Sequence, residues 1–399
     1  MKKRIASRMT SLSPSLTLAI SAKAKAMKAA GEPVVSFGVG EPDFNTPDNI
    51  IAAAKKALDD GQTKYTPSSG LLPLRKAICE KFQKDNGLDY EPSQIIVSNG
   101  AKHSIYNACF ATLEEGDEVI IPAPYWLTYP EVVKVCGATP VYLQCKKENK
   151  FKFTAEELKA AITPKTKMLI FNSPSNPTGA VYNEEEVRAI AKVCEDAEIF
   201  VLADEIYEKL CYNGVKPFSI AACSEKMKDL TITINGVSKT YAMTGWRVGY
   251  LAAPKDIAKA IDSFQSHATS NACSISQYAT IAALRSSEEE INAMVEVFDK
   301  RREKLLALVD EIDGVQAVEP DGAFYVMLVI GDLYGKSYNG KTLTNSVEFA
   351  DALLDAEKVA TVPGVSFGAD DCLRLSYSLS EEDIQTGLAR IKRFVENLR

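Results

Sequence analysis

The stretch IFVLADEIY (199–207) decides the predicted fold. Five apolar residues precede the acidic Asp204, a pattern typical of a strand that is buried on both faces of a parallel sheet. Two similar runs flank it along the chain, KMLIFNSP (167–174) and TITINGVSK (231–239), and each also ends in polar residues. Open α/β sheets bind their ligands at the carboxyl ends of the strands. We therefore expect the polar residues after these three runs to share one edge of a sheet.

The same alternation extends outward in both directions. Short apolar runs at 94–100 (QIIVSNG), 118–126 (EVIIPAPYW) and 248–254 (VGYLAAP) are separated by longer amphipathic stretches. A β-α order with strands that are apolar along their length predicts a mostly parallel sheet with helices on both faces. We assign residues 46–290 to this large α/β domain.

A second, smaller α+β domain is predicted at the carboxyl end. Residues 288–314 have a long helical pattern, three strand-like runs follow, and residues 381–399 form a closing helix. The three strand-like runs are GAFYVMLVI (322–330), KVATVPG (358–364) and CLRLSYS (372–378). Residues 1–45 are too few for a domain of their own. We expect 1–45 and 291–399 to form the smaller domain together, or the first segment to make a subunit contact.

Composition excludes several classes of protein. In 399 residues, 46 Lys and Arg against 53 Asp and Glu give a net charge of −7, which does not favour nucleic acid binding. Nine cysteines without a CxxC pair indicate thiols in a reducing cytoplasm, and two histidines are too few for a multi-histidine metal centre, so no metal site is predicted. No run approaches the roughly 18 apolar residues of a membrane span.

The start of the chain resembles a secretion signal only superficially. Lys2, Lys3 and Arg4 precede an apolar stretch of five residues, Leu16 to Ile20. A signal core needs about 7 to 15 apolar residues. We therefore expect a cytoplasmic protein.

Three partial motifs are set aside. PGVSFG (363–368) contains the G-x-S-x-G pattern of hydrolases around Ser366, but a strand-like run follows it and no histidine comes later in the chain. GDLYGKS (331–337) has three residues between its glycines where a P-loop has four. GVGEPD (38–43) matches only half of a dinucleotide-binding fingerprint.

Polar residues at the three strand ends indicate the chemistry. Asp204 alone would be explained by a helix cap or a buried salt bridge, and Lys239 alone by a solvated lysine. Asn176 follows the neighbouring run, however, and Arg247 comes eight residues after Lys239. A carboxylate, an amide, a lysine and an arginine together suit a cofactor with a basic ring nitrogen, a phosphate and an aldehyde. That cofactor is pyridoxal 5'-phosphate.

At this point a family resemblance is clear over essentially the whole chain. The motifs KYTPSSGLLPLR (64–75), NSPSNPTG (172–179), LADEIYE (202–208), SKTYAMTGWRVGY (238–250) and RLSYS (374–378) occur in this order. Together they resemble the class I aminotransferases, which are pyridoxal phosphate enzymes of transferase fold type I, and in particular the bacterial aspartate aminotransferases. The resemblance implies amino-acid metabolism through exchange of an amino group between amino acids and 2-oxo acids.

The resemblance implies a role for each motif residue around the cofactor ring. Lys239 would form a Schiff base with the cofactor and then move the proton of the substrate. Asp204 would pair with the ring nitrogen in a charge-assisted bond. Tyr207 and Asn176 would bind the phenolic oxygen of the ring, and Trp126 would stack on the ring.

The phosphate is expected at the start of a helix. The stretch SNGAK ends a strand and opens a helix, so the free amides of Gly100, Ala101 and Lys102 suit an anion. Arg247 would add a charge with fork geometry, and Ser238 a hydroxyl.

One phosphate contact is expected to come from a second chain. Tyr65 resembles the family's phosphate-binding tyrosine, which belongs to the neighbouring subunit, so the resemblance implies a homodimer with shared active sites. Relatives often have a serine three residues before the lysine, where this chain has Gly236. That hydroxyl contact is therefore not expected here.

For the substrate, the resemblance implies that Arg374 clamps the α-carboxylate and that the backbone of Gly40 touches it, beside Trp126 and Asn176. Alternation alone would make Arg374 an ordinary arginine on a strand face. Lys102 either meets the distal carboxylate of an acidic substrate or adds charge at the phosphate. We predict L-aspartate:2-oxoglutarate transamination by a ping-pong mechanism; the alternatives are aromatic, alanine or other donors, or a C–S lyase reaction.

The proton-transfer role makes one electrostatic prediction. A lysine amine must be neutral to act as a base, so we expect burial beside other cations to lower the pKa of Lys239.

Overall fold

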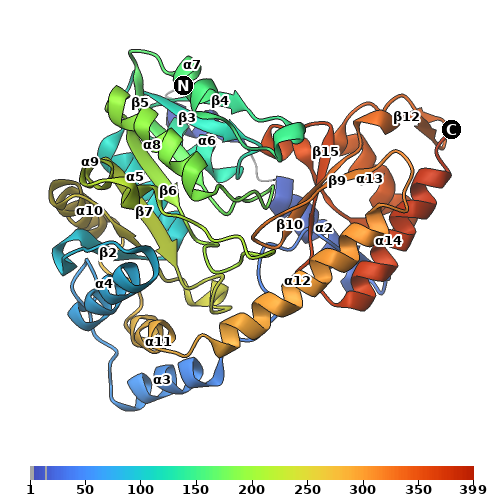
Figure 1. Ribbon diagram of the computed structural model, residues 1–399. Helices are drawn as coiled ribbons and strands as arrows, with labels where there is room; N and C mark the ends of the chain where they lie inside the picture. Colours follow the sequence, from blue (N-terminus) through green and yellow to red (C-terminus); the bar gives the residue numbers. More distant parts are fainter. Residues whose placement is uncertain (1–3, 14–15) are drawn as a thin grey trace.

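The computed structural model describes residues 4–13 and 16–399 (Figure 1). Lys2 and Lys3, which the signal-peptide argument used, lie outside the described residues, whereas Leu16–Ala29 forms helix α2. Among the helices of the described residues, none has both the length and the apolar character that crossing a bilayer requires.

The main element is a seven-stranded sheet in the order β2-β8-β7-β6-β5-β3-β4. All neighbouring strands pair in parallel except β8, which pairs antiparallel with both β2 and β7. The strands are β2 Ile95–Ser98, β3 Glu118–Ala123, β4 Thr139–Gln144, β5 Thr166–Asn172, β6 Phe200–Asp204, β7 Thr231–Gly236 and β8 Gly249–Ala252. The predicted fold class, with a mostly parallel sheet, is confirmed.

Both faces of this sheet are buried, which explains the uninterrupted apolar runs. In β5, Ile170 packs into the same cluster as α5 (Ala101–Thr112) and α10 (Lys255–Ala268). The next residue, Phe171, packs on the opposite face with α8 (Glu184–Ala197) and α7 (Ala155–Ala161). Successive side chains of a strand point to opposite faces, so each run supplies two cores at once.

Three helices cover the β2 end of the sheet. Helix α11 (Ser274–Leu284) packs against both α3 (Asp48–Asp59) and α4 (Leu72–Asn86), as Figure 1 shows below β2. Two shorter helices complete this unit. Helix α6 (Thr128–Val135) follows strand β3, and helix α9 (Glu225–Asp229) precedes strand β7.

A second sheet forms at the other end of the molecule. Its antiparallel order is β14-β15-β10-β9, and α12 (Glu289–Val309) runs toward it from the large sheet (Figure 1). Its strands are β9 Gln316–Val318, β10 Tyr325–Val329, β14 Val362–Pro363 and β15 Cys372–Ser376, and helices α13 (Ser346–Glu357) and α14 (Glu381–Glu396) pack with them. A two-residue hairpin pairs β11 (Ser337–Tyr338) with β12 (Lys341–Thr342).

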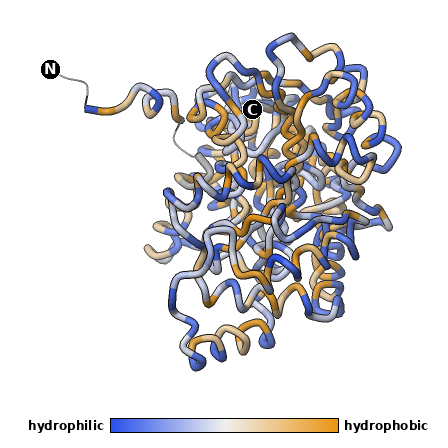
Figure 2. The backbone as a smooth tube through the Cα atoms, turned by 90° about the vertical axis from the view of Figure 1, so that its left-hand side faces the viewer, coloured by the Kyte–Doolittle hydropathy of each residue, from blue (hydrophilic) through white to orange (hydrophobic). Residues whose placement is uncertain are grey.

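The N-terminal segment joins this second unit. Strand β1 (Val35–Ser36) pairs in parallel with β13 (Val359–Ala360), and α2 packs near β13 and β14. Helix α1 (Ser7–Thr10) has no buried residue and lies in a stretch at the outside of the molecule (Figure 2), where it contacts α6 (Thr128–Val135) and Lys134 donates to the Ser11 carbonyl at 3.1 Å. We propose the division into 46–290 and 1–45 with 291–399, because each sheet falls within one of these parts.

Candidate active site

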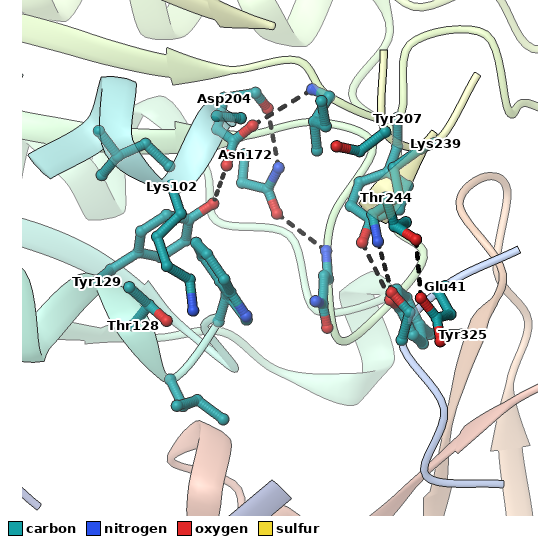
Figure 3. Close-up of a pocket in the computed structure, with 18 of the residues that line it drawn as sticks. Glu41, Lys102, Thr128, Tyr129, Asn172, Asp204, Tyr207, Lys239, Thr244 and Tyr325 are labelled. Atoms are coloured by element: carbon teal, nitrogen blue, oxygen red, sulfur yellow. Dashed lines mark hydrogen bonds between the residues drawn. The ribbon is translucent and has the colours of Figure 1, made fainter. Parts of the chain in front are cut away.

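A cavity of about 550 Å³ opens at the carboxyl ends of β5, β6 and β7, beside the first turn of α5 (Figure 3). Eleven of the thirteen site residues that the sequence predicted line it. They are Gly40, Ala101, Lys102, Trp126, Asn176, Asp204, Tyr207, Ser238, Lys239, Arg247 and Arg374. Residues separated by more than 300 positions thus meet in one pocket, because both sheets contribute to its walls.

The other two predicted residues lie elsewhere. Gly100 is the N-cap of α5 with a φ of 87°, and a Cβ built on it would lie 2.3 Å from Nη2 of Arg247. Only glycine lets the guanidinium lie across the start of this helix. Tyr65 does not line this pocket and is 90% exposed, so its place in a neighbouring subunit's site stays a prediction.

Lys239 lies three residues beyond the end of β7 and points into the cavity. Its Nζ donates a hydrogen bond to the carbonyl of Gly40. Burial lowers the pKa of Lys239 to about 8, the Glu41 carboxylate opposes this shift, and the cations of Arg374 and Arg247 add to it. The lowered lysine pKa that the sequence predicted is confirmed.

Asp204 ends β6 and is buried beneath the cavity. The Tyr129 hydroxyl donates to its Oδ2 at 2.7 Å, and the Ile206 amide donates to its Oδ1 at 3.3 Å. Burial raises the pKa of Asp204 to about 6, whereas these two hydrogen bonds and Lys239 pull it down. Burial alone would favour the neutral acid, and the two hydrogen bonds stabilise the ionised carboxylate against this effect.

The sequence analysis missed Tyr129. It follows Trp126 by three residues within PAPYWLTYP and lies in the first turn of α6. Its ring meets the Trp126 ring edge to face, with the centroids 5.3 Å apart. Trp126 precedes α6, and the Tyr129 amide donates to the Trp126 carbonyl at 3.0 Å, so a turn brings the two rings together and no helical spacing in the sequence signals it.

Arg374 lies in β15 and is buried in the wall that the second sheet contributes. Its Nη1 donates to Oδ1 of Asn176 and its Nη2 to the carbonyl of Gly38, both at 3.2 Å. In the described part of the chain it forms no ion pair with a carboxylate, although a buried cation normally requires one. The fork is therefore positioned by neutral acceptors and can receive a carboxylate from a ligand.

Tyr207 lies three residues after Asp204 and reaches across to the second sheet. Its hydroxyl lies 3.0 Å from the hydroxyl of Tyr325, in β10 (Figure 3). Burial raises the pKa of both phenols, so each stays a neutral donor. Tyr325 was also missed, because nothing in GAFYVMLVI distinguishes it from a core aromatic.

Lys102 lies in the first turn of α5 with its Nζ 4.9 Å from the ring centroid of Trp126. Burial lowers its pKa, and the nearby Arg247 lowers it further. Lys102 thus lies between the Trp126 ring and Arg247. This position is compatible with both predicted roles, contact with a distal carboxylate of the substrate and added charge at the phosphate.

The donor set of the cavity fits pyridoxal phosphate. It offers a buried amine of lowered pKa, a buried carboxylate, neutral phenol donors, and a helix N-terminus that has an arginine across it. With the two sheets, this site defines an enzyme of transferase fold type I.

Comparison with known proteins identifies the family. Residues 32–391 match the family Aminotransferase class I and II. The chain is 49% identical to the aspartate aminotransferase of Bacillus subtilis, covering 98% of this chain and 99% of that protein, and 50% identical to that of Geobacillus stearothermophilus, with the same coverage. The chain belongs to the class I and II aminotransferases and is an aminotransferase.

Two solved structures of aspartate aminotransferases have the same fold as this chain. The aspartate aminotransferase of Rhizobium meliloti superposes with a TM-score of 0.96 at 42% identity, over 100% of both chains. That of Thermus thermophilus with maleate gives 0.93 at 39% identity, over 98% of this chain and 99% of the other.

The bond from Tyr129 to Asp204 leads to a prediction. Tyr129→Phe removes a donor that lowers the pKa of Asp204, so this pKa rises and the carboxyl is more often protonated at pH 6. We expect kcat/KM for transamination to fall about tenfold at low pH and less at high pH, because the lost bond is charge-assisted. A pH profile of kcat/KM measures this.

Tyr125→Phe is the matched control, because Tyr125 stacks on Tyr142 and does not bind Asp204. An acid limb at the same pH in Tyr129→Phe and in the wild type would contradict the assigned role.

Proposed function

We propose that this aminotransferase uses pyridoxal 5'-phosphate to exchange the amino group between L-aspartate and 2-oxoglutarate. The observation that carries the proposal is one cavity that holds the buried amine of Lys239, the carboxylate of Asp204 and the unpaired guanidinium of Arg374. The names of the relatives favour aspartate over aromatic or alanine donors and over a C–S lyase reaction.

The cofactor would be held by three groups of residues. Asp204 would pair with the ring nitrogen, while Tyr207 and Asn176 would bind the phenolic oxygen and Trp126 would cover the ring. The amides of Gly100, Ala101 and Lys102 would bind the phosphate with Ser238 and Arg247. When bound, pyridoxal phosphate supplies an aldehyde for the amino group and a ring that withdraws electrons.

Lys239 would then act as the proton carrier. A pKa of about 8 leaves a useful neutral fraction near neutral pH, and the same amine can return the proton. Arg374 would hold the α-carboxylate bidentately, because both of its terminal nitrogens already point at neutral acceptors around the cavity. The α-carbon of the substrate would thereby lie within reach of the lysine.

We also propose a cytoplasmic homodimer. The nine cysteines are all free, in keeping with a reducing compartment. Tyr65 is 90% exposed within its own chain, which suits a residue that serves a partner's site.

Visible absorbance tests the cofactor and the donor together. We expect cofactor-free protein to gain a band above the protein absorbance on addition of pyridoxal phosphate, and L-aspartate without a 2-oxo acid to replace that band. Lys239→Ala is expected to abolish turnover because it removes the amine that would form the Schiff base and carry the proton. Wild-type turnover in Lys239→Ala, or no new band, would contradict the proposal; a band that aspartate leaves unchanged would contradict the donor.

Lys102 tests dicarboxylate recognition. If its ammonium meets the distal carboxylate, Lys102→Met lowers the ratio of kcat/KM for aspartate to that for alanine by about tenfold, the scale of one charged hydrogen bond. Steady-state kinetics with both donors measure the ratio. Lys56→Met is the control, since Lys56 pairs with Asp60 on an exposed helix. An unchanged ratio would assign Lys102 to the phosphate instead.

Mixed dimers test the shared site. We expect Lys239→Ala and Tyr65→Ala to be impaired separately, because one loses the amine and the other a phosphate contact. When the two are unfolded and refolded together, about a quarter of the sites regain both residues, since half of the dimers are mixed and each holds one native site. Activity assays before and after mixing measure the recovery; no recovery would contradict the role of Tyr65 across the interface.

A further inference from the structure

The loop at 38–43 bridges the two sheets directly over the cavity. On the side of the second sheet, the Ser378 hydroxyl donates to the Glu41 carbonyl at 2.7 Å and accepts from the Asp43 amide at 3.0 Å. Arg301 of α12 binds both carboxylate oxygens of Asp43, at 2.8 and 2.9 Å. A bidentate ion pair and a hydroxyl clamp therefore fix this loop to the smaller unit.

On the side of the large sheet, the same loop touches the amine of the site. The Gly40 carbonyl accepts from Nζ of Lys239, and Oε2 of Glu41 accepts from the Thr244 hydroxyl at 2.8 Å (Figure 3). Gly40, Glu41, Thr244 and Lys239 all line the cavity. The carboxylate of Glu41 is thus held in the site by a residue of the large unit, while its backbone is held by the smaller one.

The charges around Lys239 come from four separate elements. Arg247, after the short helix Thr244–Trp246, and Arg374, in β15, are cations that disfavour an ammonium. Asp204 in β6 and Glu41 in the loop are anions that favour one, and of these four charged groups Glu41 acts most strongly on the amine. Of the two anions, Asp204 would pair with the ring nitrogen of the cofactor. None of the roles proposed above involves Glu41.

We propose that Glu41 is a positioning residue of the transamination site: held by Thr244, it places a negative charge beside Lys239 and so sustains the ability of this amine to take up a proton and return it. This inference rests on the proposed role of Lys239 as the proton carrier. A proton carrier must be able to hold the proton as well as to release it, so its protonated form cannot be strongly disfavoured. Two arginines and burial all act against the protonated amine, and Glu41 offsets them.

The test measures the amine itself in cofactor-free protein. Acetic anhydride acylates only neutral amines, so the labelling of Lys239 across about pH 6 to about pH 11, read by mass spectrometry of its peptide, reports the protonation midpoint. We expect Glu41→Gln to lower this midpoint by about half a pH unit, because an attractive charge that lies partly in solvent is removed. Glu41→Asp keeps the charge and is expected to restore most of the midpoint.

Two further variants separate the charge from the structure of the loop. Thr244→Val, which frees the carboxylate, is expected to lower the midpoint in the same direction, whereas Thr244→Ser keeps the hydroxyl and is expected to match the wild type. Glu32→Gln is the control, because Glu32 lies in the same N-terminal segment but pairs with Lys358 away from the cavity.

The results distinguish this inference from the proposed function. A midpoint in Glu41→Gln equal to that of the wild type, in protein with an unchanged circular dichroism spectrum, would overturn the inference while the visible band with pyridoxal phosphate still supports the cofactor. A lowered midpoint in Glu41→Gln that Glu41→Asp restores supports it. The absence of any visible band in the wild type would remove the proposed function without altering the labelling midpoints.

Discussion

The structure of the site depends on placing a carboxylate, Asp204, in a buried position at the end of a central strand. Burial pushes its pKa up to about 6, toward the neutral acid. A hydroxyl from α6 and an amide from its own loop oppose that tendency. Strands on both sides, β5 and β7, bring polar residues to the same edge because their register with β6 is parallel.

A second constraint is that the cavity has walls from two units. Arg374, Tyr325 and the loop at 38–43 belong to the smaller one, while Lys239 and Asn176 belong to the larger. Hydrogen bonds cross between them, from Arg374 to Asn176 and between the hydroxyls of Tyr207 and Tyr325. A relative movement of the units would therefore change the electrostatic surroundings of Lys239. Arg374 lowers the pKa of Lys239, so the position of the second sheet affects the proton affinity of the amine.

How much the sequence reveals differs from element to element. Strands buried on both faces, such as β6, are visible as unbroken apolar runs because both faces need apolar side chains. The edge strand β4 (Thr139–Gln144) was missed: it has one neighbour, and its side chains are exposed or half-buried, so its composition resembles that of a loop. In the site, the sequence predicted the residues that belong to long motifs, whereas it did not predict Tyr325 and Glu41. Their contacts join segments that lie more than a hundred residues apart, and no local spacing encodes such a pair.

By itself, the sequence determined the α/β class, the family resemblance and the set of polar residues at the strand ends, because apolar periodicity and local motifs are written along the chain. Only the tertiary structure decided that Tyr129 holds Asp204, that Arg374 lies buried without a carboxylate partner, and that Thr244 holds the Glu41 carboxylate in the cavity of Lys239. The physical reason is that proton affinity and charge pairing depend on distance and burial in space. Those quantities exist only once the two sheets have packed around a common cavity.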